Sequence, residues 1–270
     1  MQETIRKQAE RALKMVAAIE PPAPLMDIYD IQKLKSSTFA PEAPEFLELT
    51  QQIGADAQSL RGCLFVQDNL VITRDDGYPQ RNNFVLAHEL GHFQLPWHKA
   101  LLYKCTQFDL SAKANKQLER EANFFASEIC FMGEHFTDQL QDSALSIRTL
   151  VRLADRFNMS KEATFRRAVE LERRPCLLIR FTANEQSDAE YLKIDYIIYS
   201  NSFTEQFGQI DHRQVFSKQH VLAQVLADPL ASLSNYFEGE ITMRDTKQQL
   251  RLESWKNRWN VFALCTPKVT

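Results

Sequence analysis

The hydrophobic and polar positions of the chain follow helical spacing in some segments and strand-like spacing in others. Over residues 2–19, apolar side chains recur at the three- and four-residue spacing of a helix with one buried face, and the prolines that follow end it. A second short helix is predicted at 26–35, and a proline-broken connector at 40–44. Residues 62–73 contain two β-rich runs on either side of Asp68 and Asn69, which predicts a hairpin.

Two longer helices are predicted in the middle of the chain. The first runs through residues 84–93, and the second covers about 112–131 with its apolar side chains on one side. The stretch 94–111 between them is predicted to be loop. Further on, residues 143–172 have the pattern of a helix, a turn and a second helix that Ser160 caps.

After Pro175 the composition becomes strand-like. The predicted strands are 176–181, 191–199 and 259–265, with a helix at 218–227. The pattern therefore predicts an α+β protein in three parts, which are residues 1–142, 143–174 and 175–270.

Composition narrows the class of protein. The chain is 44% hydrophobic and 25% charged, which is typical of a globular domain and not of a disordered one. Its formal net charge of -3 argues against a protein that coats nucleic acid through overall basicity. The exception is local, because residues 143–174 carry eight basic side chains against four acidic ones.

The sequence also indicates where the protein resides. The N-terminal segment is dotted with charge, and no stretch approaches the roughly 18 apolar residues of a membrane span, so we expect neither export nor a membrane partner. Five widely spaced cysteines without a secretory signal fit free thiols in a reducing compartment. We therefore expect a cytoplasmic protein.

The chemistry is concentrated in the run His88, Glu89 and His92, which has the pattern H-E-x-x-H. Residues four apart share one face of a helix, so both imidazoles can bind one metal ion, while Glu89 acts as the general base toward water. Such a run arises by chance about 0.01 times in a chain of this composition. Two solvated surface histidines are the alternative, but the apolar flanks predict a buried helix. A zinc site with a catalytic glutamate is the preferred interpretation.

Catalytic zinc needs a third protein ligand, and the sequence offers several. His98 has the offset found in metzincins, but a leucine occupies the position of the required glycine. Glu119, on the second long helix, is preferred, with Glu121 or Glu128 as alternatives. Asn123 lies one turn after Glu119 and is predicted to hydrogen-bond a ligating histidine.

Two blocks of sequence carry a resemblance to a known family. The run 81–92 (RNNFVLAHELGH), followed by 119–126 (EREANFFA), resembles the two signature motifs of the ImmA/IrrE family of metallopeptidases, over roughly residues 5–172. In that family the first glutamate of E-x-E-A-N ligates the metal, which implies the same role for Glu119. The segment 129–133 departs from the Leu-Met-Pro that family members typically have after the second block.

The resemblance implies a function and a layout. Many members cleave a helix-turn-helix repressor, so the implied protein is a zinc endopeptidase that cuts a transcriptional repressor after a stress or phage-infection signal. Residues 1–142 would form a mostly helical, zincin-like domain with a small sheet, 143–174 a helix-turn-helix-like linker, and 175–270 an α/β GAF-like sensor. The length is also similar to that of CapP peptidases, which relieve repression of anti-phage operons, and this suggests a role in antiviral defence. The alternative is a zinc-containing regulator that binds DNA or a partner repressor without cleaving it.

Three further features have competing interpretations. Cys105, between the two metal helices, is either an inhibitory fourth ligand or a small buried side chain. The basic segment 143–174 is either a DNA-binding surface or a linker packed on acidic neighbours. DNA, single-stranded DNA included, is thus a candidate activator, and the aromatic side chains beyond residue 200 are either stacking groups or core. The candidates for stabilising an oxyanion are Arg81, His98 and Tyr103.

Overall fold

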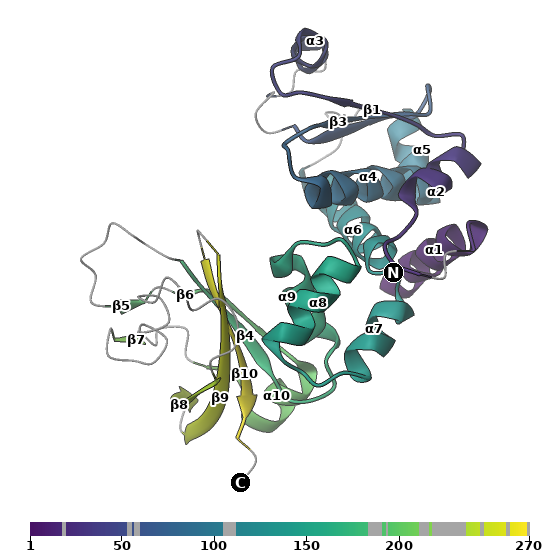
Figure 1. The fold of residues 1–270 in the computed structure, drawn as a ribbon. Coiled ribbons are helices and arrows are strands. Elements are labelled where there is room, and N and C mark those ends of the chain that lie inside the picture. The colour runs from purple at the N-terminus through teal and green to yellow at the C-terminus, as the bar shows by residue number, and fades with distance from the viewer. Residues whose placement is uncertain are drawn as a thin grey trace. The chain divides into compact units, whose positions relative to one another are not determined.

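The structure of the chain is a computed structural model. The structure describes residues 1–17, 20–52, 56, 60–104, 112–182, 191–192, 194–210, 216–217, 236–243, 246–257 and 260–268. Its internal contacts divide the chain into two compact units (Figure 1): unit 1 is Met1–Phe136 with Arg156–Ser160, and unit 2 is Thr137–Asp155 with Lys161–Thr270. The predicted α+β class is confirmed, and the boundaries predicted at 142 and 174 stay predictions.

Unit 1 contains a small mixed sheet and a group of helices. In chain order its elements are α1 (Gln2–Met15), α2 (Leu25–Ile31), β1 (Lys35–Phe39), α3 (Pro44–Gln52), β2 (Gly62–Phe65), β3 (Leu70–Arg74), α4 (Pro79–Gln94), α5 (Pro96–Lys104) and α6 (Ala112–Cys130), and then α7 (Glu134–Gln141), which continues into unit 2. The strand order is β1-β3-β2, with β1 parallel and β2 antiparallel to β3. The predicted hairpin is confirmed, and Asn69 in its turn has a left-handed φ of 47°.

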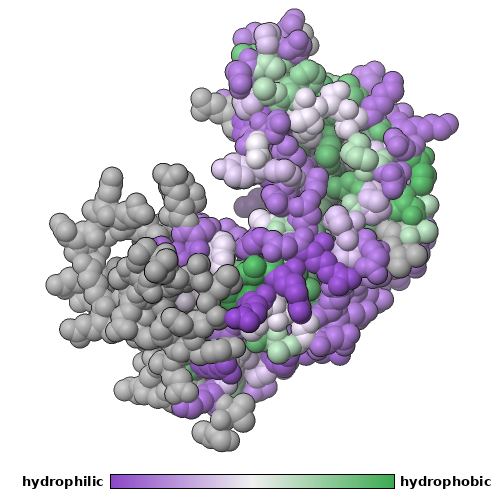
Figure 2. Space-filling view, in the orientation of Figure 1, coloured by the Kyte–Doolittle hydropathy of each residue, from purple (hydrophilic) through white to green (hydrophobic). Residues whose placement is uncertain are grey.

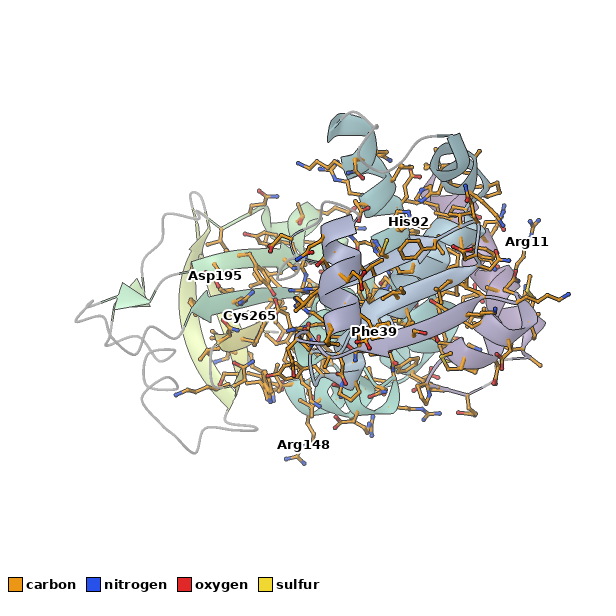
Figure 3. All side chains as sticks on the ribbon, turned by 90° about the horizontal axis from the view of Figure 1, so that it is seen from above. Arg11, Phe39, His92, Arg148, Asp195 and Cys265 are labelled. Carbon is orange, nitrogen blue, oxygen red and sulfur yellow. The ribbon has the colours of Figure 1, made fainter. Side chains whose placement is uncertain are left out.

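The helices α4 and α6 form the centre of unit 1. Apolar side chains at three- and four-residue spacing bury one side of each helix, namely Leu86, Leu90 and Phe93 on α4 and Leu118, Ala122, Phe125 and Ile129 on α6. Helix α4 covers one face of the three-stranded sheet (Figures 1 and 3). Tyr29 of α2 donates a hydrogen bond of 2.8 Å to the carbonyl oxygen of Leu86, which ties α2 to this helix.

Several predictions in unit 1 need correction. Helix α1 buries the predicted apolar stripe against α6, but it ends at Met15 instead of residue 19. The predicted loop 94–111 is wrong in its first half, because Pro96 begins helix α5, and proline is well suited to the first turn of a helix. Strand β1 was not predicted, because its sequence Lys-Ser-Ser-Thr-Phe lacks a run of apolar residues.

Unit 2 is built around an antiparallel sheet. Its elements are α8 (Ile147–Arg156, whose last residue belongs to unit 1), α9 (Lys161–Leu171), β4 (Leu177–Thr182), β5 (Tyr191–Leu192), β6 (Ile194–Tyr199), α10 (Asn201–Phe207), β7 (Phe216–Ser217), β8 (Tyr236–Met243), β9 (Thr246–Lys256) and β10 (Asn260–Pro267). The order in the main sheet is β6-β4-β10-β9-β8, and β5 pairs with β7. The strands predicted at 176–181 and 259–265 are confirmed as β4 and β10, whereas the single strand predicted at 191–199 is two strands, β5 and β6, which belong to different sheets. The helix predicted at 218–227 lies outside the described residues.

Side chains on both faces of β4 and β10 are buried. On one face, Leu177, Ile179 and Val261 form a core with Phe203 of α10. On the other, Phe165 of α9 packs edge-on against Trp255 and Phe262, at ring-centroid distances of 5.6 and 5.7 Å. Phe203 is therefore a core side chain, as the structural interpretation of the aromatic residues predicts, whereas Trp255 is partly buried against α9.

The predicted pair of helices at 143–172 is confirmed as α8 and α9. Asn158, in the turn between them, has a left-handed φ of 50°. Helix α9 buries Thr164, Phe165 and Ala168 and packs against β4 and β6, so part of its surface is not available to DNA. The basic side chains Arg148, Arg152 and Arg166 are exposed, and DNA binding by this segment stays a prediction.

The surface of the described residues gives no sign of a membrane span. Within these residues, no helix combines the length and the apolar character needed to cross a bilayer. The large hydrophobic side chains that are exposed are Met1, Met15, Met26, Ile31, Leu47 and Tyr78. In the face shown in Figure 2, hydrophobic patches alternate with hydrophilic residues. The four described cysteines are free thiols, as predicted.

Candidate metal centre

Helix α4 presents two histidines on one face. His88 and His92 are one helical turn apart, and their Nε2 atoms lie 3.1 Å from each other. The His92 side chain is 2% exposed and that of His88 is partly buried. The apolar residues of the same helix pack inside unit 1, so the two imidazoles are held at the edge of the core with their Nε2 atoms directed to the same point.

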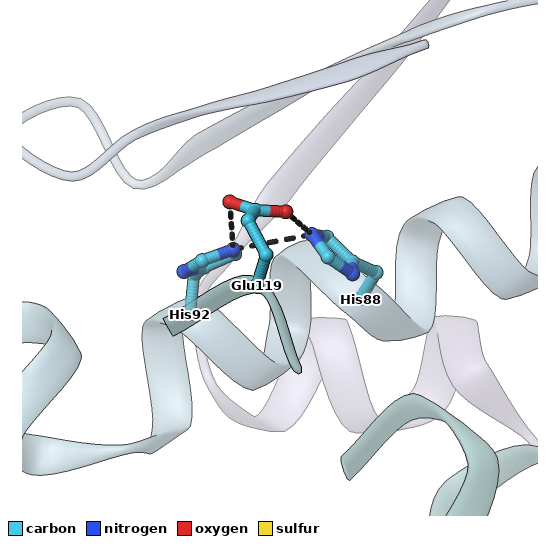
Figure 4. A group of neighbouring side chains, drawn as sticks. All are labelled: His88, His92 and Glu119. Atoms are coloured by element: carbon cyan, nitrogen blue, oxygen red, sulfur yellow. Dashed lines mark hydrogen bonds and ion pairs between the residues drawn. The ribbon is translucent and has the colours of Figure 1, made fainter. Parts of the chain in front are cut away.

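A carboxylate from α6 completes the group. The Glu119 oxygens lie 3.2 Å from His88 Nε2 and 3.4 Å from His92 Nε2 (Figure 4). Ligand atoms about 2.0 to 2.1 Å from a tetrahedral zinc ion lie about 3.3 Å apart, so all three measured separations fit. Among the described residues, these three form a group of metal-ligand atoms within 4.8 Å of one another.

The neighbours of Glu119 and His88 shift the pKa of both side chains. Burial raises the pKa of Glu119, but hydrogen bonds with His88 and His92 outweigh it and hold this pKa well below its usual value. Burial lowers the pKa of His88, and the hydrogen bond with Glu119 and the charge of Glu89 outweigh it, so that this pKa is raised. Glu119 is consequently an ionised carboxylate, which is the form that ligates a metal.

Glu89 lies beside the first histidine but outside the ligand group. It is 5% exposed, and its Oε2 atom has no hydrogen-bond partner. Burial raises the pKa of this carboxyl. Gly62 of β2 lies against it, because a Cβ atom at position 62 would be 2.8 Å from Glu89 Oε1 and 2.5 Å from Val85 Cγ1. The side chain is therefore held between the helix and the edge strand of the sheet.

These groups open on one cavity of about 330 Å³. Its wall consists of the segment that enters β2, the exposed side of α4 and one turn of α6, with the residues Leu60, Arg61, Gly62, Phe84, Val85, His88, Glu89, His92, Glu119 and Asn123. Two imidazoles, a carboxylate and an unpartnered second carboxylate thus face one space. A group of this kind can hold a divalent cation and move a proton next to it.

Each histidine has a second polar neighbour on its Nδ1 side. Asn123 Oδ1 lies 3.1 Å from His88 Nδ1, which is the contact that the predicted role of Asn123 requires. His98 Nδ1 lies 3.1 Å from His92 Nδ1, and His98 Nε2 lies 3.0 Å from Glu121 Oε2. His98 is 0% exposed, and burial lowers its pKa to about 4.

The alternative third ligands lie elsewhere. His98 and Glu121 contact the ring of His92 or each other on the side away from Glu119. Glu128 is buried near Arg6, whose Nε lies 3.4 Å from Glu128 Oε2. Sequence reasoning missed that Trp97 and Gln117 contact Glu121, with donor to acceptor distances of 2.6 Å each. The spacing of Glu119 and Glu121, two residues apart on a helix, was the one sequence signal that they face different sides.

The remaining predicted site residues either lie outside the cavity wall or fall outside the described residues. Arg81 forms an ion pair with Asp76 at 3.2 Å, and neither Arg81 nor His98 belongs to the cavity wall. The side chain of Tyr103 lies outside the described residues, and so does Cys105. The described cysteine nearest to this site in the sequence is Cys63, where burial, together with the charge of Glu89, raises the pKa to about 12.

Comparisons with known proteins identify a family domain within the chain and a solved structure with a similar fold. Residues 51–168 match the family model of the IrrE N-terminal-like domain (Peptidase_M78). A Mycobacterium tuberculosis transcriptional regulator has a similar structure, with a TM-score of 0.58 and 12% sequence identity over 98% of this chain and 76% of that chain. At this identity the likeness shows the fold alone. No curated protein matches the chain. The resemblance seen in the two sequence blocks is thereby confirmed for this part of the chain: residues 51–168 match the IrrE N-terminal-like domain of the ImmA/IrrE family.

Proposed function

We propose that this protein is a zinc-dependent endopeptidase that cleaves a helix-turn-helix transcriptional repressor in response to a stress or phage-infection signal. One observation carries the proposal: three metal-ligand atoms and the unpartnered carboxylate of Glu89 face the same cavity. The match of residues 51–168 to the IrrE N-terminal-like domain supports a metallopeptidase-type role. His88, His92 and Glu119 would be the metal ligands, Glu89 the general base, and Asn123 the hydrogen-bond partner of His88.

The donor set favours zinc over the hard cations. Two imidazole nitrogens and one carboxylate oxygen suit zinc, whereas magnesium and calcium prefer oxygen ligands throughout. When bound, the ion would supply a Lewis acid that polarises the scissile carbonyl group and lowers the pKa of a water molecule. Three protein ligands leave one position of a tetrahedron open for that chemistry.

Glu89 would move the proton. Its carboxylate is the neighbour of His88 along the chain, and its free Oε2 atom has no competing donor among the described residues. Burial raises the pKa of this carboxyl, which brings it closer to that of a base that works near neutral pH. Glu89 would accept a proton from the attacking water and donate it to the leaving amine.

The substrate and the signal rest on the family. Its members in many cases cleave a helix-turn-helix repressor, so a DNA-binding regulator is the proposed substrate class. Unit 2 would correspond to the linker and the GAF-like sensor, and unit 1 to the zincin-like domain. The exposed basic side chains of α8 and α9 would make DNA, including single-stranded DNA, a candidate activator. The similar fold of a transcriptional regulator fits a regulatory setting.

The variant Glu89→Gln tests the proposal. We expect it to bind zinc as tightly as the wild type, because Glu89 is outside the ligand group, and to cleave the repressor about 10²- to 10⁴-fold more slowly, because the base is lost. Cleavage is followed by gel electrophoresis, and metal content by atomic absorption. The matched control is Glu134→Gln, an exposed glutamate on α7, which should leave both readouts unchanged.

Two results would contradict the proposed function. Undiminished cleavage by Glu89→Gln would exclude Glu89 as the base. A wild-type protein that binds zinc and the repressor, but leaves every peptide bond of the repressor intact, would favour the alternative of a regulator without proteolytic activity.

A further inference from the structure

A chain of buried polar side chains leads away from the metal-facing side of His92. Its Nδ1 atom lies 3.1 Å from His98 Nδ1, and the opposite nitrogen of His98 lies 3.0 Å from Glu121 Oε2. All three side chains are almost completely buried, with 2%, 0% and 5% of each residue exposed. A buried polar chain of this kind must match donors with acceptors throughout, because an unmatched member is costly.

The carboxylate of Glu121 determines which nitrogen of His98 carries the hydrogen. Trp97 Nε1 donates to Glu121 Oε2, and Gln117 Nε2 donates to Glu121 Oε1, both at 2.6 Å. An indole N–H can only donate, and a carboxylate with a donor on each oxygen is an acceptor on both. The third neighbour of this carboxylate, His98 Nε2, therefore also donates, and so it carries a hydrogen.

The position of the hydrogen on His98 then determines the position of the hydrogen on His92. A neutral imidazole has one N–H, so a hydrogen on Nε2 leaves His98 Nδ1 as an acceptor. The nitrogen that faces it, His92 Nδ1, must then be the donor. A neutral His92 with its hydrogen on Nδ1 has a free lone pair on Nε2, the atom that faces His88 and Glu119.

We propose that Glu121 and His98 are positioning residues that fix the ring orientation and the tautomer of His92, so that its Nε2 lone pair is directed at the metal position. The proposal rests on the metal centre proposed above and adds to it the residues that prepare one of its ligands. Neither residue touches the cavity. Both act through His92, and such outer partners of ligating histidines commonly change metal affinity by about 10- to 100-fold.

Helix α6 contacts His88 directly and His92 through an intermediate residue. Asn123 of α6 contacts His88 directly, at 3.1 Å. Glu121 of the same helix reaches His92 only through His98 of α5. Helix α6 would thus supply one ligand, Glu119, together with the groups that orient the other two ligands. The arrangement predicts that a change in α5 weakens metal binding although α5 contributes no ligand.

The direction of the central hydrogen bond can be measured directly. In protein with ¹⁵N-labelled histidine, an N–H···N hydrogen bond gives a coupling between the two nitrogens, and the directly attached hydrogen identifies the donor. The six histidines are assigned from single variants. We expect a coupling between Nδ1 of His92 and Nδ1 of His98, with the hydrogen on His92, in the zinc-loaded full-length protein. A hydrogen on His98 Nδ1, or no coupling, would overturn the proposal.

Zinc affinity provides the second test, by competition with a chromophoric chelator. His98→Phe keeps a ring but removes both nitrogens, and we expect zinc binding about 10- to 100-fold weaker. His98→Gln retains an acceptor and a donor and should recover part of the loss. Glu121→Gln keeps an acceptor for His98 and should weaken binding about tenfold. Should His98→Phe fail to fold, as judged by thermal unfolding without metal, Glu121→Gln and the coupling carry the test.

The outcomes separate this inference from the proposed function. His135→Gln and Glu134→Gln, at exposed positions of α7, are the matched controls and should bind zinc like the wild type. If the wild type binds zinc and His88→Ala does not, while the His98 and Glu121 variants keep wild-type affinity, the positioning role is wrong and the metal centre stands. If the wild type binds no zinc, the metal centre is wrong, and this inference falls with it.

Discussion

Three glutamates near the two histidines lie in different environments, and their environments separate their roles. Glu119 has 42% of its side chain exposed and two imidazoles beside it, and these neighbours hold its pKa low although burial alone would raise it. Glu89 is buried, has one unpartnered oxygen, and has a raised pKa. Glu121 is surrounded by N–H donors on the far side of His92. One residue type is thus suited to ligation, to proton transfer and to orientation.

Gly62 is the residue that controls the position of Glu89. A Cβ atom there would lie 2.8 Å from Glu89 Oε1 and 2.5 Å from Val85 Cγ1, so Gly62→Ala requires both side chains to shift relative to β2. Because small displacements of a reacting group reduce rates strongly, we expect repressor cleavage about 10- to 100-fold slower. Zinc affinity should stay within about twofold, since Glu89 is not a ligand. The measurements are the cleavage rate and chelator competition.

Gly208→Ala is the control for this prediction. Gly208 has a left-handed φ of 74° and no atom within 4 Å of a Cβ at that position, so alanine strains the backbone without touching Glu89. It should cost about 1 to 3 kcal/mol of stability and leave cleavage unchanged. Normal cleavage by Gly62→Ala would show that the position of Glu89 tolerates displacement.

At this scale the site could be predicted only where a sequence motif contains its residues. The pair His88 and His92 follows from helical spacing, and Glu119 from the second sequence block; the structure brings all three together, while their roles as ligands stay predictions. The contact of Glu121 with His92 depends on His98, and the segment that contains His98 was predicted to be loop. No spacing rule connects residues on three separate elements, so this network was not predictable.

At the scale of elements, the distance between α4 and α6 determines whether Glu119 reaches the histidines. The two helices are in close contact at Gly91, where a Cβ atom would lie 3.3 Å from the Cα atom of Ala122 and 3.1 Å from Phe125 Cδ1. Gly91 immediately precedes His92, and Ala122 lies three residues after Glu119. Packing at this contact therefore sets the geometry of the ligands one turn away.

Gly91→Ala tests this dependence. Alanine favours the helix by about 1 kcal/mol, but overpacking a close contact costs about 1 to 3 kcal/mol. We therefore expect a net loss of up to about 2 kcal/mol in the free energy of unfolding, and weaker zinc binding, because α4 must move away from α6. Thermal unfolding without metal and chelator competition measure the two effects. A more stable variant with wild-type zinc affinity would contradict this account of the contact.

Elements with strong periodicity were predicted, and elements fixed by tertiary contacts were not. The apolar spacing in α4 and α6 is sufficient to identify both helices. Strand β1 owes its structure to parallel pairing with β3, from Lys35 with Leu70 to Phe39 with Arg74, which its own polar sequence does not indicate. In unit 2, the amino end of α8 is anchored by a distant side chain, since Ile147 N–H donates to Glu253 Oε2 at 2.8 Å.

At the scale of the whole molecule, the residues of the segment 143–174 are divided between the two units. Most of α8 and all of α9 belong to unit 2, whereas the turn between them, Arg156–Ser160, belongs to unit 1. Phe157 in that turn packs with Phe131 and Phe136, at ring-centroid distances of 6.4 and 5.2 Å. A sequence pattern identifies the two helices and the turn, but it cannot show that neighbouring residues stabilise different cores.

Two phenylalanines on either side of this division allow a matched comparison. Phe157 is 2% exposed in unit 1, and Phe165, eight residues later, is 0% exposed in unit 2 against Trp255 and Phe262. Truncation of either ring to alanine should cost about 3 to 5 kcal/mol. Hydrogen exchange measured by mass spectrometry should then increase in α6 and α7 for Phe157→Ala, and in β4, β9 and β10 for Phe165→Ala. Zinc binding should weaken only for Phe157→Ala, because α6 carries Glu119. Equal loosening of both units by either variant would show that they unfold as one body.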